Sequence, residues 1–545
     1  MPQPRKQSAS LAASQAASQA ASLDAATRDT LTDAGEDEGH GEARAPCLTI
    51  LAHPDPTRVG QRAVLADLLR PGAQLPLSRM GPAFAAPGAS RFEPLGVRRL
   101  SRSPVLLRQH EAGGGLTIDA SRTRTAVEVD GAPLTERREV PRDALAAGVT
   151  LVLGGRVAVL LHLRALPRVQ PPPALGMVGH SEALDDLRDA LRRAAATDVP
   201  VLLRGETGTG KELAARALHE HSRRAAGPFR AVDMGTLPST LAASALFGHT
   251  RGAFSGADRA RKGHLVTAHG GTLLLDEVGE SPPEVQAMLL RVLESGRCLP
   301  VGSDREVEVD VRVVSATDAD LEGAVARGAF RAPLLHRLAG IVLELPPLRR
   351  RREDVGLLLI HFLRAELAAL GSEERLVPAD DEAPWLSARL VARLARYGWP
   401  GNVRELRNAA RQIAVFSHDA ARAALDPGLE QRTRKAPHPE PVAGPGGQSL
   451  ARSRGPAPPA DEVILGSLEA HGWSVAATAS ALGLARSTLY DWMERSPDVR
   501  KASDLSREEI ERALTAAAGD RVAAARALRV SRRGFTLRLR ALNAG

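Results

Sequence analysis

The spacing of hydrophobic positions changes along the chain, and each change indicates a different kind of element. Between residues 48 and 166, short apolar runs such as LTIL, TAVEVD and VTLVLGG are separated by Gly, Pro and Asp. This pattern is typical of a small β-sandwich. Residues 176–417 alternate buried-strand runs, among them VPVLLRG and TLLLDEV, with helical stretches. That alternation predicts a three-layer α/β domain around a parallel sheet.

The C-terminal region has helical spacing and contains an internal repeat. A shift of 46 positions superposes Ile464 on Ile510, Leu468 on Leu514, Leu482 on Leu528 and Leu489 on Phe535. We therefore expect two copies of one small helical unit, over residues 461–498 and 503–545.

Composition marks the boundaries between these regions. Residues 1–46 are of low complexity, with an Ala/Ser/Gln-rich run and an acidic patch, so we expect a disordered tail there. Residues 426–460 hold eight Pro and five Gly in 35 positions, which indicates a flexible linker. The β-sandwich is assigned to 47–166, followed by a Pro-rich connection, and the α/β domain to 176–417.

Bulk composition excludes several classes of protein. No stretch of about 18 uncharged apolar residues exists that could span a membrane, and the N-terminus lacks a signal-peptide pattern. The two cysteines, Cys47 and Cys298, cannot build a disulfide framework, so we expect a cytoplasmic protein. The net charge of +8 permits a nucleic-acid partner without proving one.

A glycine-rich segment carries the strongest chemical signal. The run GETGTGKE follows an apolar strand and opens a helical stretch. In that context backbone N–H groups and a helix N-terminus wrap phosphates, and Lys211 adds a point charge. Lysine is informative here because only 5 of 72 basic residues are Lys. The expected nucleotide-binding residues are Gly205, Glu206, Thr207, Gly208, Thr209, Gly210, Lys211 and Glu212, the last standing where Ser or Thr is usual.

A second apolar run, GGTLLLDE, ends in two acidic residues 65 positions after the lysine of the phosphate loop. Asp276 would hold Mg²⁺, chiefly through water, and Glu277 would activate the attacking water in ATP hydrolysis. Two acids after an apolar run can also cap a helix, but their place after a phosphate loop favours the catalytic role.

A third segment, LFGHTRGAFSGA, places an aromatic ring between glycines. Phe254 is flanked by Gly252 and Gly256, which disfavour a stable helix or strand. Aromatic residues make up only 3% of this chain, so a Phe at such a site favours an anchor presented to a partner. A Phe folded back into the core is the alternative.

In their order along the chain, these motifs resemble the AAA+ domain of bacterial enhancer-binding proteins, which activate sigma-54 RNA polymerase. Residues 176–417 share with that family GETGTGKE, GGTLLLDEVGE, VDVRVVSATDADL, FRAPLLHRLAGIVLELPPLRRRREDV and YGWPGNVRELRN. The resemblance accounts for Glu212, and it implies an ATPase with an α-helical lid that binds ATP and Mg²⁺ and works as a homo-oligomer, a hexamer when active.

The resemblance also implies roles for single residues. Arg331 and Arg337 match the arginines that reach the γ-phosphate in the neighbouring subunit, and Arg404 matches the nucleotide-sensing arginine of the lid. Asp318 in the sensor motif and Asp233 both stand where the family usually has Asn. Extra carboxylates near ATP predict slower hydrolysis unless they are hydrogen-bonded or protonated.

The Phe254 segment resembles the family's GAFTGA loop, which contacts sigma-54. The matching residues are Gly252, Ala253, Phe254, Ser255, Gly256 and Ala257. Ser255 keeps the hydroxyl of the usual Thr and lacks its methyl group. Acidic residues common in relatives are replaced by Ala243, Ala245 and Thr250. We still expect contact with sigma-54.

The C-terminal repeats resemble the Fis-type helix-turn-helix that ends such activators. The residues expected to face DNA are Arg486, Ser487, Thr488 and Tyr490 in the first copy and Arg532 and Arg533 in the second, less regular copy. Residues 461–498 carry two Arg and six acids, whereas 499–545 carry eleven basic residues and five acids. Because phosphate attraction supplies much of DNA affinity, we expect the second copy to supply backbone affinity and the first to shape base reading. A plain helical hairpin is the alternative.

The N-terminal segment resembles the forkhead-associated (FHA) β-sandwich, which binds phosphothreonine. Arg79, Ser101 and Arg102 fall where that family contacts phosphate. Its usual Gly, His and Asn are replaced by Ser78, Pro104 and Asp130. Phosphopeptide binding is one interpretation, and a sandwich that docks on the ATPase without recognising phosphate is the other.

Together these expectations describe a multidomain, cytoplasmic transcription activator: an all-β FHA-like sandwich, a central α/β AAA+ ATPase with a helical lid, and an all-α tandem helix-turn-helix. It would bind upstream double-stranded DNA and drive the Phe254 loop against sigma-54 so that the promoter opens. The sandwich would gate assembly through a phosphothreonine protein, as in two-component-like signalling. Two alternatives stay open. A remodelling ATPase with another partner is disfavoured by the Phe254 loop, and a repressor with a dead ATPase by the intact catalytic residues.

Overall fold

The computed structural model describes most of the first 435 residues and a smaller part of the C-terminal region. The described residues are 44–70, 72–110, 115–165, 172–254, 257–378, 383–435, 461–471, 473–475, 478, 482, 489, 505–517, 520–528, 530, 535 and 538–539. The chain divides into two compact units between Gly444 and Pro445. The predicted tail lies outside the described residues except for its last three.

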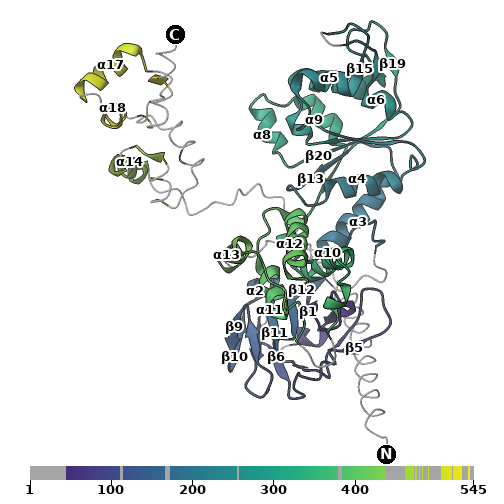
Figure 1. The fold of residues 1–545 in the computed structure, drawn as a ribbon, viewed down its shortest axis with the longest axis vertical. Helices are drawn as coiled ribbons and strands as arrows, with labels where there is room; N and C mark the ends of the chain where they lie inside the picture. The colour runs from purple at the N-terminus through teal and green to yellow at the C-terminus, as the bar shows by residue number, and fades with distance from the viewer. Residues whose placement is uncertain are drawn as a thin grey trace, which may run out of the picture. The chain divides into compact units, whose positions relative to one another are not determined.

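The first unit begins with two antiparallel sheets (Figure 1), one in the order β2-β1-β12-β11-β8-β9 and one in the order β10-β7-β6-β3. The strands are β1 (Arg44–Ala52), β2 (Arg62–Val64), β3 (Gln74–Leu77), β6 (Val105–Gln109), β7 (Leu116–Asp119), β8 (Val127–Val129), β9 (Ala132–Leu134), β10 (Arg137–Val140), β11 (Val149–Leu153) and β12 (Val157–Ala165). The predicted β-rich fold is confirmed, although this region also contains one short helix, α2 (Arg142–Ala147). β1 starts before residue 47 because its pairing with β12 already begins at Arg44, opposite Ala165.

The next region is built on a parallel sheet in the order β14-β17-β20-β13-β21. Its elements are α3 (Glu182–Ala195), β13 (Val201–Arg204), α4 (Lys211–Glu220), β14 (Phe229–Asp233), α5 (Ser239–Phe247), β17 (Thr272–Asp276), α7 (Pro283–Ser295), β20 (Arg312–Thr317), α8 (Leu321–Ala326), α9 (Ala332–Leu338) and β21 (Ile341–Glu344). Successive strand residues enter different cores: Leu273 and Leu275 pack on one face and Leu274 on the other. Both faces are therefore covered, as the continuous apolar runs predict.

A helical lid follows the sheet. It comprises α10 (Val355–Ala369), α11 (Ala388–Arg396), α12 (Asn402–Ser417) and α13 (Pro427–Lys435). Its core is completely buried at Leu363, Leu394, Trp399 and Leu406. The predicted helical lid is therefore confirmed. On the side of the sandwich, α10 and α11 lie against β1, and α11 also lies against β11 and β12 (Figure 1).

The lid extends further than the sequence predicts, and this corrects the start of the 426–460 linker. Its first ten residues belong to the lid, because α13 packs on α11. The Asp426 side chain accepts hydrogen bonds from Gly428 N and Leu429 N, which caps the helix, and Leu429 is buried in the lid core. Pro and Gly at 427 and 428 are typical of a linker, but Pro is also well suited to the first turn of a helix.

The second unit contains α14 (Asp461–Ala470), α17 (Arg507–Ala516) and α18 (Arg521–Ala527). Ile464, Leu468 and Leu489 lie in one small core. Of their counterparts in the repeat, Ile510 and Phe535 lie in a second core of the same kind, and Leu514 packs against it. Each repeat therefore uses equivalent positions to build its own helical core.

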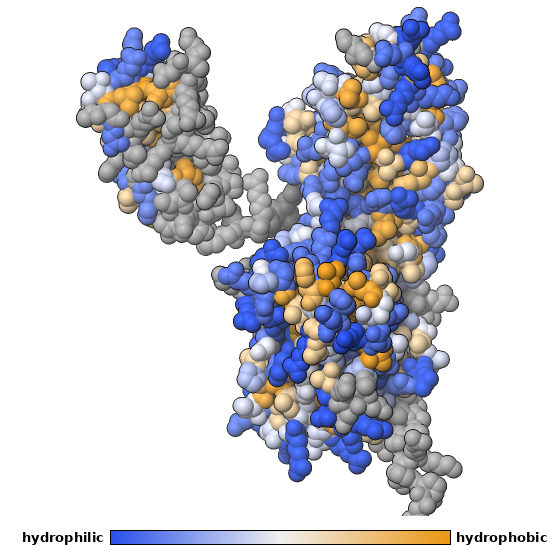
Figure 2. All heavy atoms as spheres, viewed as in Figure 1, coloured by the Kyte–Doolittle hydropathy of each residue, from blue (hydrophilic) through white to orange (hydrophobic). Residues whose placement is uncertain are grey.

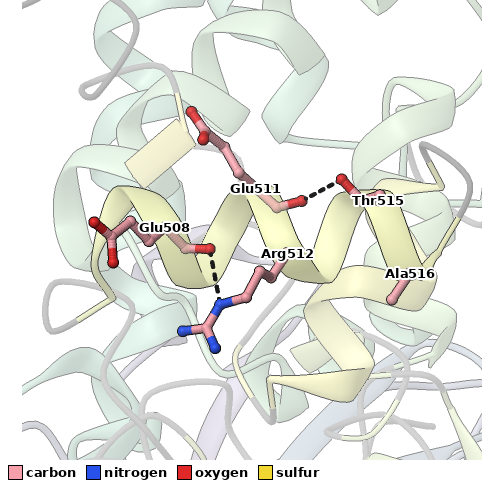
Figure 3. A pocket seen from close by; sticks show the side chains of 5 residues that line it. All are labelled: Glu508, Glu511, Arg512, Thr515 and Ala516. Atoms are coloured by element: carbon pink, nitrogen blue, oxygen red, sulfur yellow. Dashed lines mark hydrogen bonds between the residues drawn. The ribbon is translucent and has the colours of Figure 1, made fainter.

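The first helix of the second repeat is fixed by its own polar groups. Ser506 and Glu509 form a capping box at the start of α17. A shallow hollow on this helix is lined by Glu508, Glu511, Arg512, Thr515 and Ala516 (Figure 3). Arg512 Nε donates to Glu508 O (3.4 Å), and Thr515 Oγ1 donates to Glu511 O (2.8 Å). With two carboxylates, this face of α17 is poorly suited to contact DNA phosphates.

In the described part of the chain, no helix is both long enough and apolar enough to cross a bilayer.

Candidate functional site

Three neighbouring parallel strands bring the predicted nucleotide-binding residues together. β20 pairs with both β13 and β17, so the carboxyl ends of these strands meet at one edge of the sheet. The phosphate loop follows β13, Asp276 is the last residue of β17 with Glu277 directly after it, and Asp318 follows β20. This edge is where α/β sheets commonly bind their ligands.

Two positions of the phosphate loop require glycine because of their backbone conformation, and one of them also for lack of space. Gly208 and Gly210 have φ angles of 80° and 105°, which side chains rarely adopt. An added Cβ at Gly208 would also lie 2.4 Å from Gly401 O of the lid. The loop then leads into α4, whose free N-terminal N–H groups favour an anion.

Lys211 lies at the centre of the site. The side chain is buried, and its Nζ donates to Gly205 O at 2.9 Å. The same Nζ lies 3.2 Å from Glu277 Oε1. The lysine and the predicted catalytic base are therefore in direct contact.

Glu277 has an unusual backbone and an unusual environment. Its φ angle of 49° is rare for a residue with a side chain and occurs often at functional sites. Burial raises the pKa of its carboxyl group, the Lys211 charge opposes this shift, and the Asp318 charge adds to it. Such a carboxylate is more basic than an ordinary Glu, which suits a general base.

The two aspartates that depart from the family are placed differently. Asp318 Oδ2 accepts from Thr207 Oγ1 at 2.6 Å, and Asp318 N donates to Glu277 Oε2 at 3.3 Å. It is thus hydrogen-bonded within the site. Asp233 is exposed and accepts from Gly235 N at 2.9 Å. Of the two, Asp318 is the one that acts on Glu277.

The lid and the segment that leads into it contact the phosphate loop through Asn402 and Arg349, for which the motifs predict no role. Arg349 forms a two-pronged ion pair with Glu206, with N–O distances of 2.7 and 2.5 Å. This pair lowers the pKa of the Glu206 carboxyl group. Asn402 Nδ2 donates to Glu206 Oε2 and to Thr207 O, both at 3.1 Å.

Asn402 has a backbone suited to this position. Its φ angle of 51° is one that Asn adopts more readily than most residues. Its Oδ1 accepts from Leu348 N, so the buried amide is satisfied on both sides. Arg404, the predicted lid sensor, is exposed, and its Cβ would be 3.0 Å from a Cβ added at Gly208.

The two predicted finger arginines lie away from this network. Arg331 is exposed and precedes α9, and its N–H donates to Gln286 Oε1. Arg337 donates twice to Leu293 O, at 3.1 and 2.9 Å. Among the described residues, neither forms a hydrogen bond or ion pair with the phosphate loop of its own chain.

The Phe254 segment extends from a short two-stranded ribbon of β15 (Gly248–His249) and β16 (Arg261–Lys262). The Phe254 side chain is 37% exposed, so the alternative of a core Phe does not hold. Its ring lies 5.0 Å from that of His249, whose Nδ1 is 2.7 Å from Ser244 Oγ. Gly252, Ala253 and Ala257 are described, whereas Ser255 and Gly256 lie outside the described residues.

The predicted phosphopeptide residues lie on loops of the sandwich. Arg79 donates to Arg98 O at 3.1 Å, which ties it to the loop that carries Ser101 and Arg102. Ser101 Oγ accepts from Ser103 N, and Arg102 is exposed. The predicted DNA-facing residues, Arg486, Ser487, Thr488, Tyr490, Arg532 and Arg533, lie outside the described residues.

Comparison with known proteins matches three parts of the chain to families. Residues 177–344 match the sigma-54 interaction domain, and 349–440 match an AAA+ ATPase lid domain. Residues 501–542 match the Fis family of bacterial regulatory proteins. The Fis match covers the second repeat, which is the basic one.

Curated relatives cover the same region. The DNA-binding transcriptional regulator NtrC of Salmonella typhimurium is 45% identical over 245 residues, which are 45% of this chain and 50% of NtrC. The chain therefore spans about half the length of this relative. The C4-dicarboxylate transport regulator DctD of Rhizobium meliloti is 41% identical over 339 residues, 62% of this chain and 68% of DctD.

Among solved structures, NtrX from Brucella abortus in complex with ADP is 30% identical, with a TM-score of 0.41, and the match covers 59% of this chain and 68% of NtrX. The family matches occur in the order of the domains described above, and DctD is similar over most of its length. The chain belongs to the family of sigma-54-dependent enhancer-binding transcription activators.

Proposed function

We propose that this protein hydrolyses ATP to remodel sigma-54 RNA polymerase at promoters, from the cytoplasm, while bound to upstream DNA. The observation that carries the proposal is the contact network at the sheet edge. Lys211 contacts Glu277, Glu277 contacts Asp318, and Asp318 contacts Thr207 of the phosphate loop. Phosphate-binding, base and sensor groups are thus linked by direct contacts.

The network suggests how these residues act on ATP. The β- and γ-phosphates compete with Glu277 for Lys211, so nucleotide binding would release the carboxylate to orient and deprotonate a water molecule. Mg²⁺ would supply charge neutralisation of the phosphates. Asp276 would hold it, since Mg²⁺ needs only one or two carboxylates besides phosphates and water.

The proposed active form is a homo-oligomer, a hexamer, because a single chain leaves its site incomplete. The finger arginines make no contact with their own phosphate loop in the described residues, as expected of groups that serve a neighbour. The lid also presents apolar surface: residues of this kind gather over α12 (Figure 2), where Val415 and Phe416 are 46% and 73% exposed. Such surface suits contact between subunits.

Asp318→Asn should shift the acid limb of the ATPase pH profile to lower pH. Glu277 must be ionised to act as a base, so activity falls as pH drops through its pKa. The Asp318 charge helps to raise that pKa, and Asn removes the charge while keeping an acceptor for Thr207. The measurement is kcat/KM against pH, which reports the free enzyme. An unmoved limb would exclude Glu277 as the titrating base.

His249→Leu should weaken sigma-54 binding while leaving ATPase activity near normal. The His249 ring contacts Phe254 and is anchored to Ser244, so it holds the aromatic ring in place. We expect a loss of about tenfold in affinity, of the size of one interface contact. His264→Leu, a nearby partly buried histidine, is the control. Equal losses in both variants would contradict a specific role.

DNA binding is assigned to the tandem C-terminal repeats, with Arg532 and Arg533 in the basic copy.

The N-terminal sandwich is proposed to be FHA-like and to receive a phosphothreonine signal, which would make it the input of a two-component-like pathway. The connection of Arg79 to the loop with Ser101 and Arg102 supports this assignment. Two arginines and a serine supply the kinds of donor group that recognise phosphate.

Binding to sigma-54 is tested by mixing the full chain with sigma-54 in the presence of ADP and aluminium fluoride. ADP with aluminium fluoride mimics the transition state of ATP hydrolysis. A stable complex on native gels is expected, and its absence when Phe254 is replaced by Ala would assign the contact. An ATPase that is active but forms no complex would instead indicate a remodelling enzyme with a different protein partner.

A further inference from the structure

The six-stranded sheet of the sandwich has two buried faces, which is unusual for a sandwich. All five residues of β11 are buried. Leu151 and Leu153 point into the sandwich core, whereas Val152 packs in the core of the lid. In β12, Val157 and Val159 enter the sandwich core and Ala158 and Leu160 the lid core. The lid therefore covers the outer face of this sheet.

The two domains approach each other at the level of the backbone. Gly356, near the start of α10, faces β1 so closely that an added Cβ would lie 2.2 Å from Leu51 O. Real Cβ atoms do not approach a backbone oxygen this closely. A side chain at this position would therefore push the lid and the sandwich apart.

Buried polar groups also bridge the two domains. Arg352, 5% exposed, donates to Ala147 O (2.5 Å) and Gly148 O (2.7 Å) of the sandwich. It also donates to Ala395 O of the lid at 2.8 Å. A buried guanidinium is stabilised only while such acceptors are present, so its position depends on both domains.

The residues before Arg352 contact the nucleotide site. Arg351 donates to Thr209 O in the phosphate loop at 3.3 Å, and Arg349 pairs with Glu206. Four consecutive arginines, 349–352, thus contact the phosphate loop at one end and the sandwich at the other. The two sets of contacts are therefore only a few residues apart along the chain.

We propose that the sandwich is docked permanently on the lid and controls nucleotide binding through the segment 349–352. The lid and the sandwich move as one body, so a ligand that displaces the sandwich weakens the contacts of the lid with the phosphate loop. By reciprocity, nucleotide binding changes affinity for that ligand by the same factor. The coupling, though not the docking, rests on the proposed nucleotide site.

The docking is tested in the full chain, with a protease recognition sequence in place of residues 167–171. After cleavage, the wild-type fragments should elute together on gel filtration at micromolar concentration, and in high salt, because the interface is mainly apolar. Gly356→Ala should separate them. Ala favours a helix more than Gly does, so this loss cannot come from a weaker α10. Gly398→Ala, on the same lid, is the matched control because a Cβ added there meets no atom within 4 Å.

A charge swap in an ion pair between the lid and the sandwich gives a second test of the docking. Arg389 of α11 pairs with Glu128 of β8 at 2.5 Å. Glu128→Arg and Arg389→Glu should each weaken co-elution, and the double variant should restore it. Wild-type fragments that separate after cleavage would overturn the docking, as would equal behaviour of the Gly356 and Gly398 variants.

The coupling is measured with fluorescent ADP in the uncut proteins. We expect Gly356→Ala to raise Kd about fivefold, at the low end of known coupling, and Gly398→Ala to leave it unchanged. If Gly356→Ala separates the fragments after cleavage but leaves the Kd for ADP unchanged, the coupling is refuted. Failure of every variant, wild type included, to bind nucleotide would refute the proposed function instead, while co-elution would still decide the docking.

Discussion

Arg331→Ala should abolish ATP hydrolysis and leave ATP binding intact. Arg331 is exposed and forms no contact with its own phosphate loop among the described residues, so its removal leaves that loop unchanged. In an oligomer its guanidinium would neutralise charge that develops on the γ-phosphate of the next subunit. An arginine of this kind contributes about 10³–10⁵-fold in rate. Steady-state hydrolysis and fluorescent ATP titration measure the two effects separately.

The control is Arg327→Ala, an exposed arginine four positions earlier, which should retain activity. A mixing experiment then tests action between subunits. Arg331→Ala and Lys211→Ala are each expected to be inactive, but a mixture of both should regain part of the activity. Some sites in the mixture combine an intact Lys211 with an intact neighbouring Arg331. Loss of ATP binding in Arg331→Ala, or no recovery on mixing, would contradict the role in trans.

Glu277→Gln should also stop hydrolysis, but with the opposite effect on affinity. Loss of a general base costs about 10²–10⁴-fold in rate. The Glu277 carboxylate lies 3.2 Å from Lys211 Nζ and competes with the phosphates for it. The neutral amide competes less, so ATP should bind more tightly than in the wild type. Single-turnover hydrolysis and an ATP titration measure both quantities.

Glu280→Gln is the matched control, since Glu280 is exposed and three residues away. It should leave both rate and affinity unchanged. Weaker ATP binding in Glu277→Gln would mean that the carboxylate supports the loop rather than competing for its lysine. Retained hydrolysis would require another base, and Asp318, hydrogen-bonded to Thr207, would be the first residue to test.

The phosphate loop and the layered α/β domain could be predicted because their signals are local. GETGTGKE needs only adjacent residues, and a continuous apolar run such as TLLLD indicates a strand covered on both faces. The lid contacts could not be found in this way. Glu206 and Arg349 are 143 positions apart, and Glu206 and Asn402 are 196 apart, so only the folded chain brings them together.

Two features have sequences that suit more than one structure. Pro and Gly at 427 and 428 are typical of a linker, but Asp-Pro-Gly followed by Leu429 also suits a helix start. The runs VTLVL and VAVLLHL lack the polar alternation of a solvent-facing sandwich sheet. That absence already indicated that the outer face of the sandwich is covered, here by the lid.

ATP hydrolysis by this chain is proposed to open a sigma-54 promoter. The most direct measurement is permanganate footprinting of single-stranded thymines at such a promoter, with sigma-54 polymerase, the full chain and ATP. Reactive thymines are expected with ATP and the wild-type chain, and not with a non-hydrolysable analogue or with Phe254→Ala. Opening without hydrolysis, or a closed promoter despite normal ATPase activity and sigma-54 binding, would refute the proposed function.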